Sequence, residues 1–204
     1  HIYETILKNE SRNKADNKKY DIAILGYYGY KNSGDEAILR SAVDALRRID
    51  PELSFMVFSR NPKETMKVYL VDSVNRFNIV KVFRMLKTTR LFLAGGGSLI
   101  QDNTSNRSIW YYLTVLRMAK RLGAKTMLFA NGIGPIKRKF NRSMAGKTLN
   151  TLDAISLRDS GSFSEIKAMG IKNPHIYVTS DPAVLLEPAC REDVDRLMES
   201  EEIP

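Results

Sequence analysis

Two glycine-centred turns, each between an expected strand and an expected helix, constrain this chain more than any other feature. The first spans residues 26–37 (GYYGYKNSGDEA) and the second residues 94–102 (AGGGSLIQD). Glycine is needed where the backbone takes a positive φ or comes close to a ligand. A strand-to-helix turn also directs free N–H groups and the helix dipole at one point, which favours an anion. If both turns end neighbouring parallel strands, they share a crevice. The pattern therefore favours an enzyme that binds an anionic ligand.

Short apolar strands alternate with amphipathic helices along most of the chain, and this alternation predicts the fold. A chain that alternates in this way forms a mostly parallel sheet with helices on both faces, so we expect a doubly wound α/β fold. The expected strands span residues 21–25, 53–58, 73–77, 90–94, 126–130, 154–157 and 176–178. The expected helices span residues 34–49, a short segment from 62, 80–87, 104 or 105 to 122, 141–152 and 160–169.

The expected domain organisation has three parts. Residues 1–20 form a polar extension without the apolar region of a signal peptide, residues 21–187 a Rossmann-like domain, and residues 188–204 a linker or helix toward a carboxyl-terminal domain. The single cysteine, Cys190, excludes an internal disulfide and suits a reducing compartment, so we expect a cytoplasmic protein. His1 lies in the extension and His175 at the wrong edge for chemistry, so we expect no metal site.

The chain is basic, with 32 Lys and Arg against 23 Asp and Glu and a net charge of +9. Nucleic-acid binding is one interpretation, but the basic residues are spread along the chain, with the densest cluster at 137–142. An anionic small molecule or an anionic membrane surface fits the excess at least as well. We expect no nucleic-acid partner and keep a peripheral contact with the inner face of the membrane as an alternative.

Polar residues in the two turns are candidate ligand contacts. The first turn has neither the dinucleotide-binding glycine spacing nor a P-loop lysine. Its residues Asn32, Ser33 and Asp35 either cap the next helix or face a ligand, and a carboxylate there could act on a sugar hydroxyl as an acceptor or base. The second turn has three consecutive glycines, more than a simple turn needs, and they leave backbone open to an anion.

The segments at 130–135, 157–162 and 179–182 follow later strands at the same expected edge of the sheet. Arg158 offers a planar guanidinium suited to carboxylate or phosphate, although a lone arginine there is often only an ion-pair partner. Asp159 or Ser160 is expected to cap the next helix. Asp181 is equally suited to be a cap, a base or an ion partner.

Taken together, these segments resemble the polysaccharide pyruvyl transferase family. The resemblance rests on residues 26–39, 95–105, 131–135, 155–162 and 180–182, whose order and spacing agree from about residue 21 to residue 187. The most similar branch is the bacterial one that pyruvylates a cell-wall polymer anchoring surface-layer proteins.

The resemblance implies a glycosyltransferase-B-like enzyme of two domains, of which this chain is the amino-terminal half. It implies phosphoenolpyruvate as the co-substrate, with no other cofactor, and an acetylated hexosamine, lipid-linked, as the acceptor. The product would be a cyclic pyruvate ketal. The family's catalytic histidine belongs to the second domain, so we expect the isolated 204-residue chain to be inactive.

The resemblance also assigns roles to residues of this chain. The candidate catalytic residues are Asp35 and Asp102, with the main acid expected in the second domain. The donor-binding residues are Arg158, Ser160 and Ser162. The acceptor-binding residues are Gly29, Asn32, Gly34, Gly95, Gly96, Gly97, Ser98, Gln101 and Asn131.

Two other functions stay open. A nucleotide-sugar glycosyltransferase of the same architecture would hold its nucleotide in the carboxyl-terminal domain, so this half alone does not distinguish it. A stand-alone ligand-binding module is the non-enzyme alternative. A dinucleotide dehydrogenase is more distant because the glycine spacing of the first turn is wrong.

Overall fold

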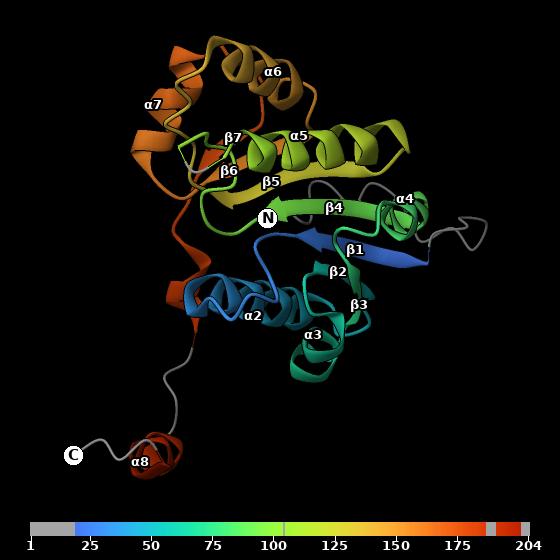
Figure 1. The fold of residues 1–204 in the computed structure, drawn as a ribbon, viewed down its shortest axis with the longest axis vertical. Coiled ribbons are helices and arrows are strands. Elements are labelled where there is room, and N and C mark those ends of the chain that lie inside the picture. Colours follow the sequence, from blue (N-terminus) through green and yellow to red (C-terminus); the bar gives the residue numbers. More distant parts are fainter. Residues whose placement is uncertain (1–18, 104, 187–190, 201–204) are drawn as a thin grey trace.

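A computed structural model describes residues 19–103, 105–186 and 191–200. Most of the polar extension predicted at 1–20, part of the segment predicted at 188–204, and Thr104, one of the two expected starts of the helix that ends at 122, lie outside these residues. The described part contains seven strands in one sheet and the helices that connect them (Figure 1).

All seven strands are parallel and lie in the order β3-β2-β1-β4-β5-β6-β7. The strands are β1 (Tyr20–Leu25), β2 (Phe55–Ser59), β3 (Asp72–Asn75), β4 (Thr89–Gly95), β5 (Lys125–Asn131), β6 (Ala154–Leu157) and β7 (Ile176–Val178). The helices are α2 (Ser33–Ile49), α3 (Pro62–Tyr69), α4 (Ile79–Lys87), α5 (Asn106–Arg121), α6 (Lys139–Leu149), α7 (Ser160–Ala168), the 3-10 helix η1 (Pro182–Leu185) and α8 (Arg191–Ser200). The predicted doubly wound α/β class is confirmed.

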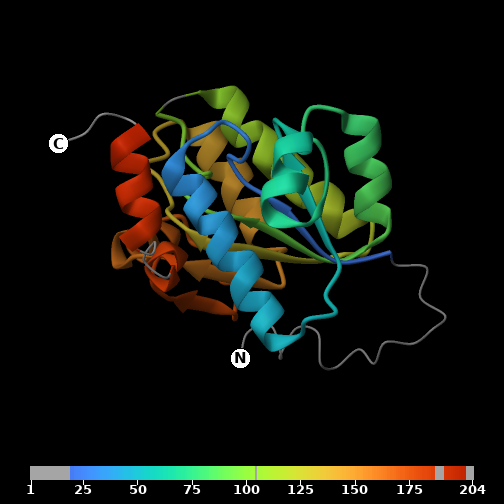
Figure 2. The same ribbon diagram turned by 90° about the horizontal axis from the view of Figure 1, so that it is seen from below.

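Alternating side chains of the strands build two cores, one on each face of the sheet. Ala23 and Leu25 of β1 belong to the core that also contains side chains of α4, α5, α6 and α7, whereas Ile22 and Ile24 belong to the core that contains side chains of α2 and α3. The same alternation holds in the other central strands, as the period of two residues in a strand requires. Figure 2 shows α2 and α3 in front of the sheet, with α5 behind it.

Most expected strands and helices are present, with shifts of one to three residues at their ends. The prediction of a strand at 73–77 is wrong at its end, because β3 stops at Asn75. There the side chain of Asn75 accepts a hydrogen bond from the N–H of Phe77, and Arg76 turns into the interior. The helix predicted at 141–152 is α6, which begins at Lys139 and ends at Leu149.

The strand order reverses between β1 and β4, and in open α/β sheets such a reversal forms a crevice at the carboxyl edge. From β1 the chain proceeds to β2 on one side, and from β4 it proceeds to β5 on the other. Ligands of open α/β sheets bind at such a switch point. The two glycine turns of the sequence follow these two strands, so they flank the crevice as predicted.

Tyr28 joins the two sides of the crevice. Its side chain is 1% exposed, and its hydroxyl donates a hydrogen bond of 2.7 Å to the carbonyl of Gly95 at the end of β4. A Cβ on Gly26 would lie 2.5 Å from the same carbonyl oxygen, so the loop after β1 passes very close to β4. The tyrosine therefore holds the first turn against the second.

We predict that Tyr28→Phe lowers the free energy of unfolding by about 1–2 kcal/mol, because a buried hydrogen bond is lost while the ring still fills its place. Urea unfolding followed by circular dichroism measures the change. The matched control is Tyr27→Phe, whose ring is exposed and stacked on Tyr30 and which should change stability by less than about 0.5 kcal/mol. Equal effects of the two substitutions would contradict the prediction.

Candidate functional site

Backbone hydrogen bonds tie the loops after β4, β5 and β6 into one rim. The N–H of Gly132 donates to the carbonyl of Gly97 at 3.0 Å, and the N–H of Gly134 donates to Ile100 at 2.8 Å. The N–H of Arg158 donates to the carbonyl of Asn131 at 3.3 Å. The predicted convergence of these segments at one edge is therefore confirmed.

The second glycine turn approaches the start of α2 across the crevice. Gly96 and Gly97 have φ values of 83° and 72°, which strain any other residue. A Cβ on Gly97 would lie 2.8 Å from a carboxylate oxygen of Asp35, so a larger residue would push this carboxylate away. Glycine is therefore required at position 97 both by the positive φ of the backbone and by the close approach of Asp35.

Asp35 carries the most unusual carboxylate of the rim. Burial, followed by the neighbouring charge of Glu36, raises its pKa from 3.8 to about 6, against the opposing effect of Arg158 and Arg76. Its backbone N–H donates to Asn32, the cap of α2, whereas its carboxylate makes no hydrogen bond to another described residue. A carboxyl group with such a pKa can exchange a proton near neutral pH.

The adjacent Glu36 has a structural role instead. Its carboxylate accepts hydrogen bonds from the N–H of Gly29 at 2.7 Å and from the hydroxyl of Tyr69 at 2.6 Å. These contacts hold the loop after β1 against α3. Of the two acids at the start of α2, only Asp35 is left to act on a ligand.

Arg158 lies at the other end of the rim, after β6. Its guanidinium donates to the hydroxyl of Ser98 at 3.1 Å and to a carboxylate oxygen of Asp181 at 3.2 Å, and it stays partly exposed. Asp181 also accepts a hydrogen bond from the N–H of Ala183, so it is both a cap and an ion partner. Arg158 and the glycine turn are thus joined through Ser98.

Asp102, the other predicted catalytic acid, is held by the loop before α6. Burial opposes its ionisation, but hydrogen bonds from the N–H of Lys137, from Asn141 and from the N–H of Arg138 lower its pKa below the usual value. These bonds occupy both carboxylate oxygens. The contacts favour a structural role, and the catalytic role stays a prediction.

Several other predicted contacts also serve the structure. Asn131 is fully buried and its side-chain oxygen accepts from the N–H of Leu99, while Ser162 accepts from the N–H of Ile133. Gly29 packs against the loop at 59–61 rather than the crevice, and Asn32 caps α2. Ser105, one of the two expected starts of α5, caps this helix and accepts a hydrogen bond from the N–H of Arg107. The ligand roles of Gly29, Gly34, Gly95, Gln101 and Ser160 stay predictions.

Arg76 is a rim residue that the sequence did not reveal. It is 3% exposed, and one guanidinium nitrogen donates at 2.5 Å to the carbonyl of Gly26. The guanidinium carbon lies 4.8 Å from the ring centre of Tyr111 and 5.2 Å from that of Tyr112. It holds the end of β1 and adds positive charge near Asp35. The only signal was an arginine close to the end of a weakly marked strand.

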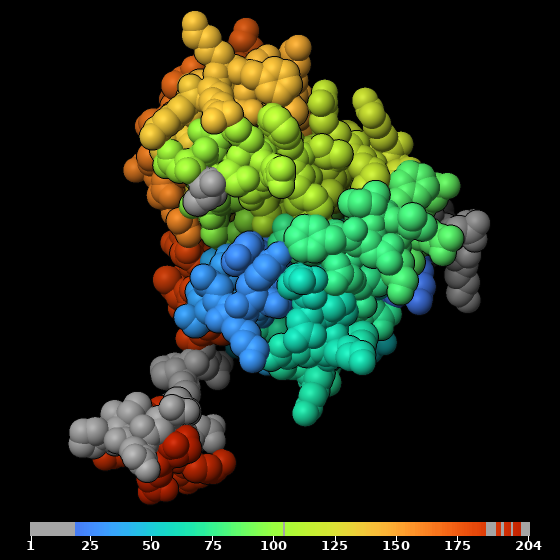
Figure 3. Space-filling view, viewed as in Figure 1, coloured from blue at the N-terminus to red at the C-terminus, as the bar shows by residue number. Residues whose placement is uncertain are grey.

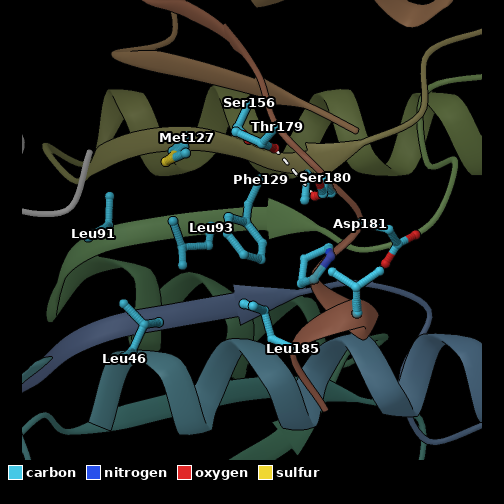
Figure 4. Close-up of a pocket in the computed structure, with 13 residues that line it drawn as sticks. Leu46, Leu91, Leu93, Met127, Phe129, Ser156, Thr179, Ser180, Asp181 and Leu185 are labelled. Carbon is cyan, nitrogen blue, oxygen red and sulfur yellow. Dashed lines mark hydrogen bonds between the residues drawn. The ribbon is translucent and has the colours of Figure 1, made fainter. Parts of the chain in front are cut away.

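A cavity of about 350 Å³ lies beside the rim on the α2 face of the sheet (Figure 4). Leu46, Leu93 and Phe129 form its apolar wall, and Ser180 and Asp181 stand at its polar end. Such a wall does not suit a phosphate or a sugar, whose polar groups would lose water without gaining hydrogen bonds. That the anionic ligand lies instead at the rim between Asp35 and Arg158 stays a prediction.

The strand order and the alternating helices define a Rossmann-like α/β domain. The structure is similar to that of a glycosyltransferase from Rickettsia africae ESF-5, with a TM-score of 0.53 at 13% sequence identity. The match covers 91% of this chain and 50% of that protein, so the chain spans about half the length of that structure. At this identity the likeness concerns the fold alone.

The family model of polysaccharide pyruvyl transferase matches residues 32–201, and the chain therefore belongs to this family. No curated protein sequence matches significantly. Among the described helices, none is long and apolar enough to cross a membrane. In the part of the chain that the structure describes, no three His, Cys, Asp or Glu side chains form a group that could hold a metal ion.

We predict that Asp35→Asn stabilises the protein at pH 7.5 but not at pH 3. Because the pKa is raised to about 6 in the folded state, ionisation of Asp35 costs stability as the pH rises through 6, whereas below 3.8 both states hold the proton. Partial exposure and the favourable position of an acid at a helix start reduce the gain to about 0.5–1 kcal/mol. Urea unfolding at both pH values measures it, and a gain at pH 3 would contradict the cause.

We also predict that Arg158→Gln moves the pKa of Asp35 further above 6, because the largest opposing positive charge is removed. Arg158→Lys keeps the charge and should keep the pKa near 6. Titration of the Asp35 carboxyl carbon by nuclear magnetic resonance measures both, with Lys63→Gln on α3 as the control. An unchanged pKa of Asp35 in Arg158→Gln would show that the charge of Arg158 does not act on the Asp35 carboxyl group.

Proposed function

We propose that the complete protein transfers the pyruvyl group of phosphoenolpyruvate to an acetylated hexosamine of a lipid-linked cell-wall precursor and forms a cyclic pyruvate ketal. The observation that carries the proposal is the crevice in which a carboxyl group with a pKa of about 6 and a partly exposed guanidinium face the same glycine turn. Membership in the polysaccharide pyruvyl transferase family supports a pyruvyl donor and a polysaccharide acceptor in general.

Arg158 would bind the donor. A guanidinium forms paired hydrogen bonds with carboxylate and phosphate, and phosphoenolpyruvate has both groups. The present partners of Arg158, Ser98 and Asp181, hold the guanidinium at the rim while leaving part of it open. The adjacent Ser160 and Ser162 stay proposed donor contacts.

Asp35 would act on the acceptor. In the proposed reaction the methylene carbon of phosphoenolpyruvate takes a proton, and one sugar hydroxyl attacks the carbon next to it. The neighbouring hydroxyl then displaces phosphate and closes the ketal. The two hydroxyl groups each release a proton. One of these protons restores the acid that protonated the methylene carbon, and the other leaves with phosphate. A carboxylate with a pKa near 6 is well suited to accept a hydroxyl proton, which contributes about 10²–10⁴-fold to rate.

The remaining groups would come from a second domain, which we propose supplies the acid that protonates the methylene carbon. The glycine turn at 95–97 and Ser98 would then position the sugar beside Asp35. Holding both substrates in one crevice lowers the entropic cost of the reaction. This division of roles places the acceptor on the side of the described domain.

We predict that Arg158→Ala in the complete enzyme lowers kcat/KM for phosphoenolpyruvate by about 10–100-fold, because a charged hydrogen bond worth about 1.5–3 kcal/mol is lost. Steady-state phosphate release measures the rate, and Lys63→Ala on α3 is the control. Thermal stability should change little. Unchanged kinetics would remove Arg158 from the donor site.

Calorimetry with phosphoenolpyruvate and with UDP distinguishes the proposed reaction from a nucleotide-sugar glycosyltransferase. Binding of phosphoenolpyruvate that depends on Arg158 supports the proposal. Tight binding of UDP without binding of phosphoenolpyruvate would contradict it.

A further inference from the structure

Among the described helices, the excess of positive charge is concentrated on one face of the sheet. Helices α4, α5 and α6 carry three, four and three Lys or Arg and no Asp or Glu. On the opposite face of the sheet, α2 carries three acids and three arginines. Two of the ten cations pair with acids of other segments, Lys120 with Asp153 and Arg142 with Glu165. The other helical cations keep this face strongly positive.

Large apolar side chains are exposed among these cations. Trp110 on α5 is 43% exposed, Phe140 on α6 is 67% exposed, and Phe77 before α4 is 54% exposed. Ring contacts link the helices: Trp110 lies 6.4 Å from Phe140, and Phe77 lies 5.9 Å from Tyr111. Val80 and Ile79 add exposed aliphatic groups at the start of α4. Figure 3 shows α6 at the top, α5 directly below it and α4 to the right.

We propose that this basic aromatic face, formed by α4, α5 and α6, docks on an anionic membrane surface. Cations interleaved with exposed tryptophan, phenylalanine and aliphatic side chains are typical of surfaces that enter the headgroup region of a bilayer. Anionic headgroups complement the charge. A nucleic acid would use the cations and aromatic rings but would gain little from Ile79 and Val80, which offer no flat ring for a base.

The face continues to the rim of the crevice. The indole N–H of Trp110 donates to the side-chain oxygen of Asn141 at 2.9 Å, and the amide nitrogen of Asn141 donates to Asp102 at 2.9 Å. A membrane docked here would therefore lie beside the loop that follows β4. A membrane-anchored acceptor would enter the crevice from this side. This entry rests on the proposed function, whereas the docking of the face on a membrane does not.

The chain contains a built-in probe for this contact, because Trp110 is its only tryptophan. The fluorescence of the full chain is recorded with vesicles of phosphatidylcholine alone and with vesicles containing about one third phosphatidylglycerol. We expect Trp110 emission to move to shorter wavelength with the anionic vesicles only, and brominated lipids to quench it. High salt should reverse both effects.

A pair of matched variants tests the face itself. Lys81→Glu with Lys139→Glu replaces two cations of the face near helix starts, where an acid also favours the helix. This variant should bind anionic vesicles at least about 30-fold more weakly, from about fivefold for each of the two lost cations. Lys63→Glu with Lys67→Glu on α3 makes the same change of net charge on the other face. The affinity of this control variant for anionic vesicles should stay within about threefold of that of the unchanged chain. Its two charges lie on the face away from the membrane, where salt screens their interaction with the headgroups.

Three results would overturn the proposal. They are an unchanged Trp110 emission with anionic vesicles, equal losses of binding in the two variants, and tighter binding of random duplex DNA than of vesicles at the same salt concentration. The last result would assign the face to nucleic acid. Pyruvyl transfer to a soluble acceptor tests the proposed function without a membrane, so failure of one leaves the other standing.

Discussion

The close approach of two loops across the reversal of strand order is the constraint on which the rest of the structure depends. The hydroxyl of Tyr28 holds the loop after β1 to the end of β4, and the backbone at Gly97 then comes within contact distance of Asp35. This approach excludes water from one side of the carboxylate, and burial is the largest cause of its raised pKa. Packing between two loops thus sets the chemistry of the crevice.

Positive charge balances this half-buried carboxyl from two directions. Arg158 reaches the rim from β6, where Ser98 and Asp181 hold it, and Arg76 reaches it from the end of β3, among aromatic rings. Burying a carboxylate without nearby cations would raise its pKa further and remove it from use at neutral pH. The two arginines therefore keep Asp35 in the range where it can lose and regain a proton.

The sequence predicted the strands and the edge at which the loops meet, because apolar alternation and glycine turns are local signals. It could not separate Asp35 from Asp102, since both follow glycine turns. The difference comes from Lys137, Arg138 and Asn141, about 35 residues along the chain, whose hydrogen bonds occupy Asp102. Arg76 was missed for a similar reason: its role comes from Tyr111 and Gly26, which only the tertiary fold brings to it.

Charge shows the same limit of local patterns. Read along the sequence, the basic residues are spread and suggest no surface, because helices α4, α5 and α6 are separated by strands that carry few charges. The right-handed crossovers of a parallel sheet bring these helices to one face and leave the acids of α2 on the other. The net charge of +9 is therefore distributed unevenly over the surface. The basic aromatic face has exposed aromatic side chains among its cations and borders the crevice. The topology that places the crevice also determines which way the charged face of the molecule points.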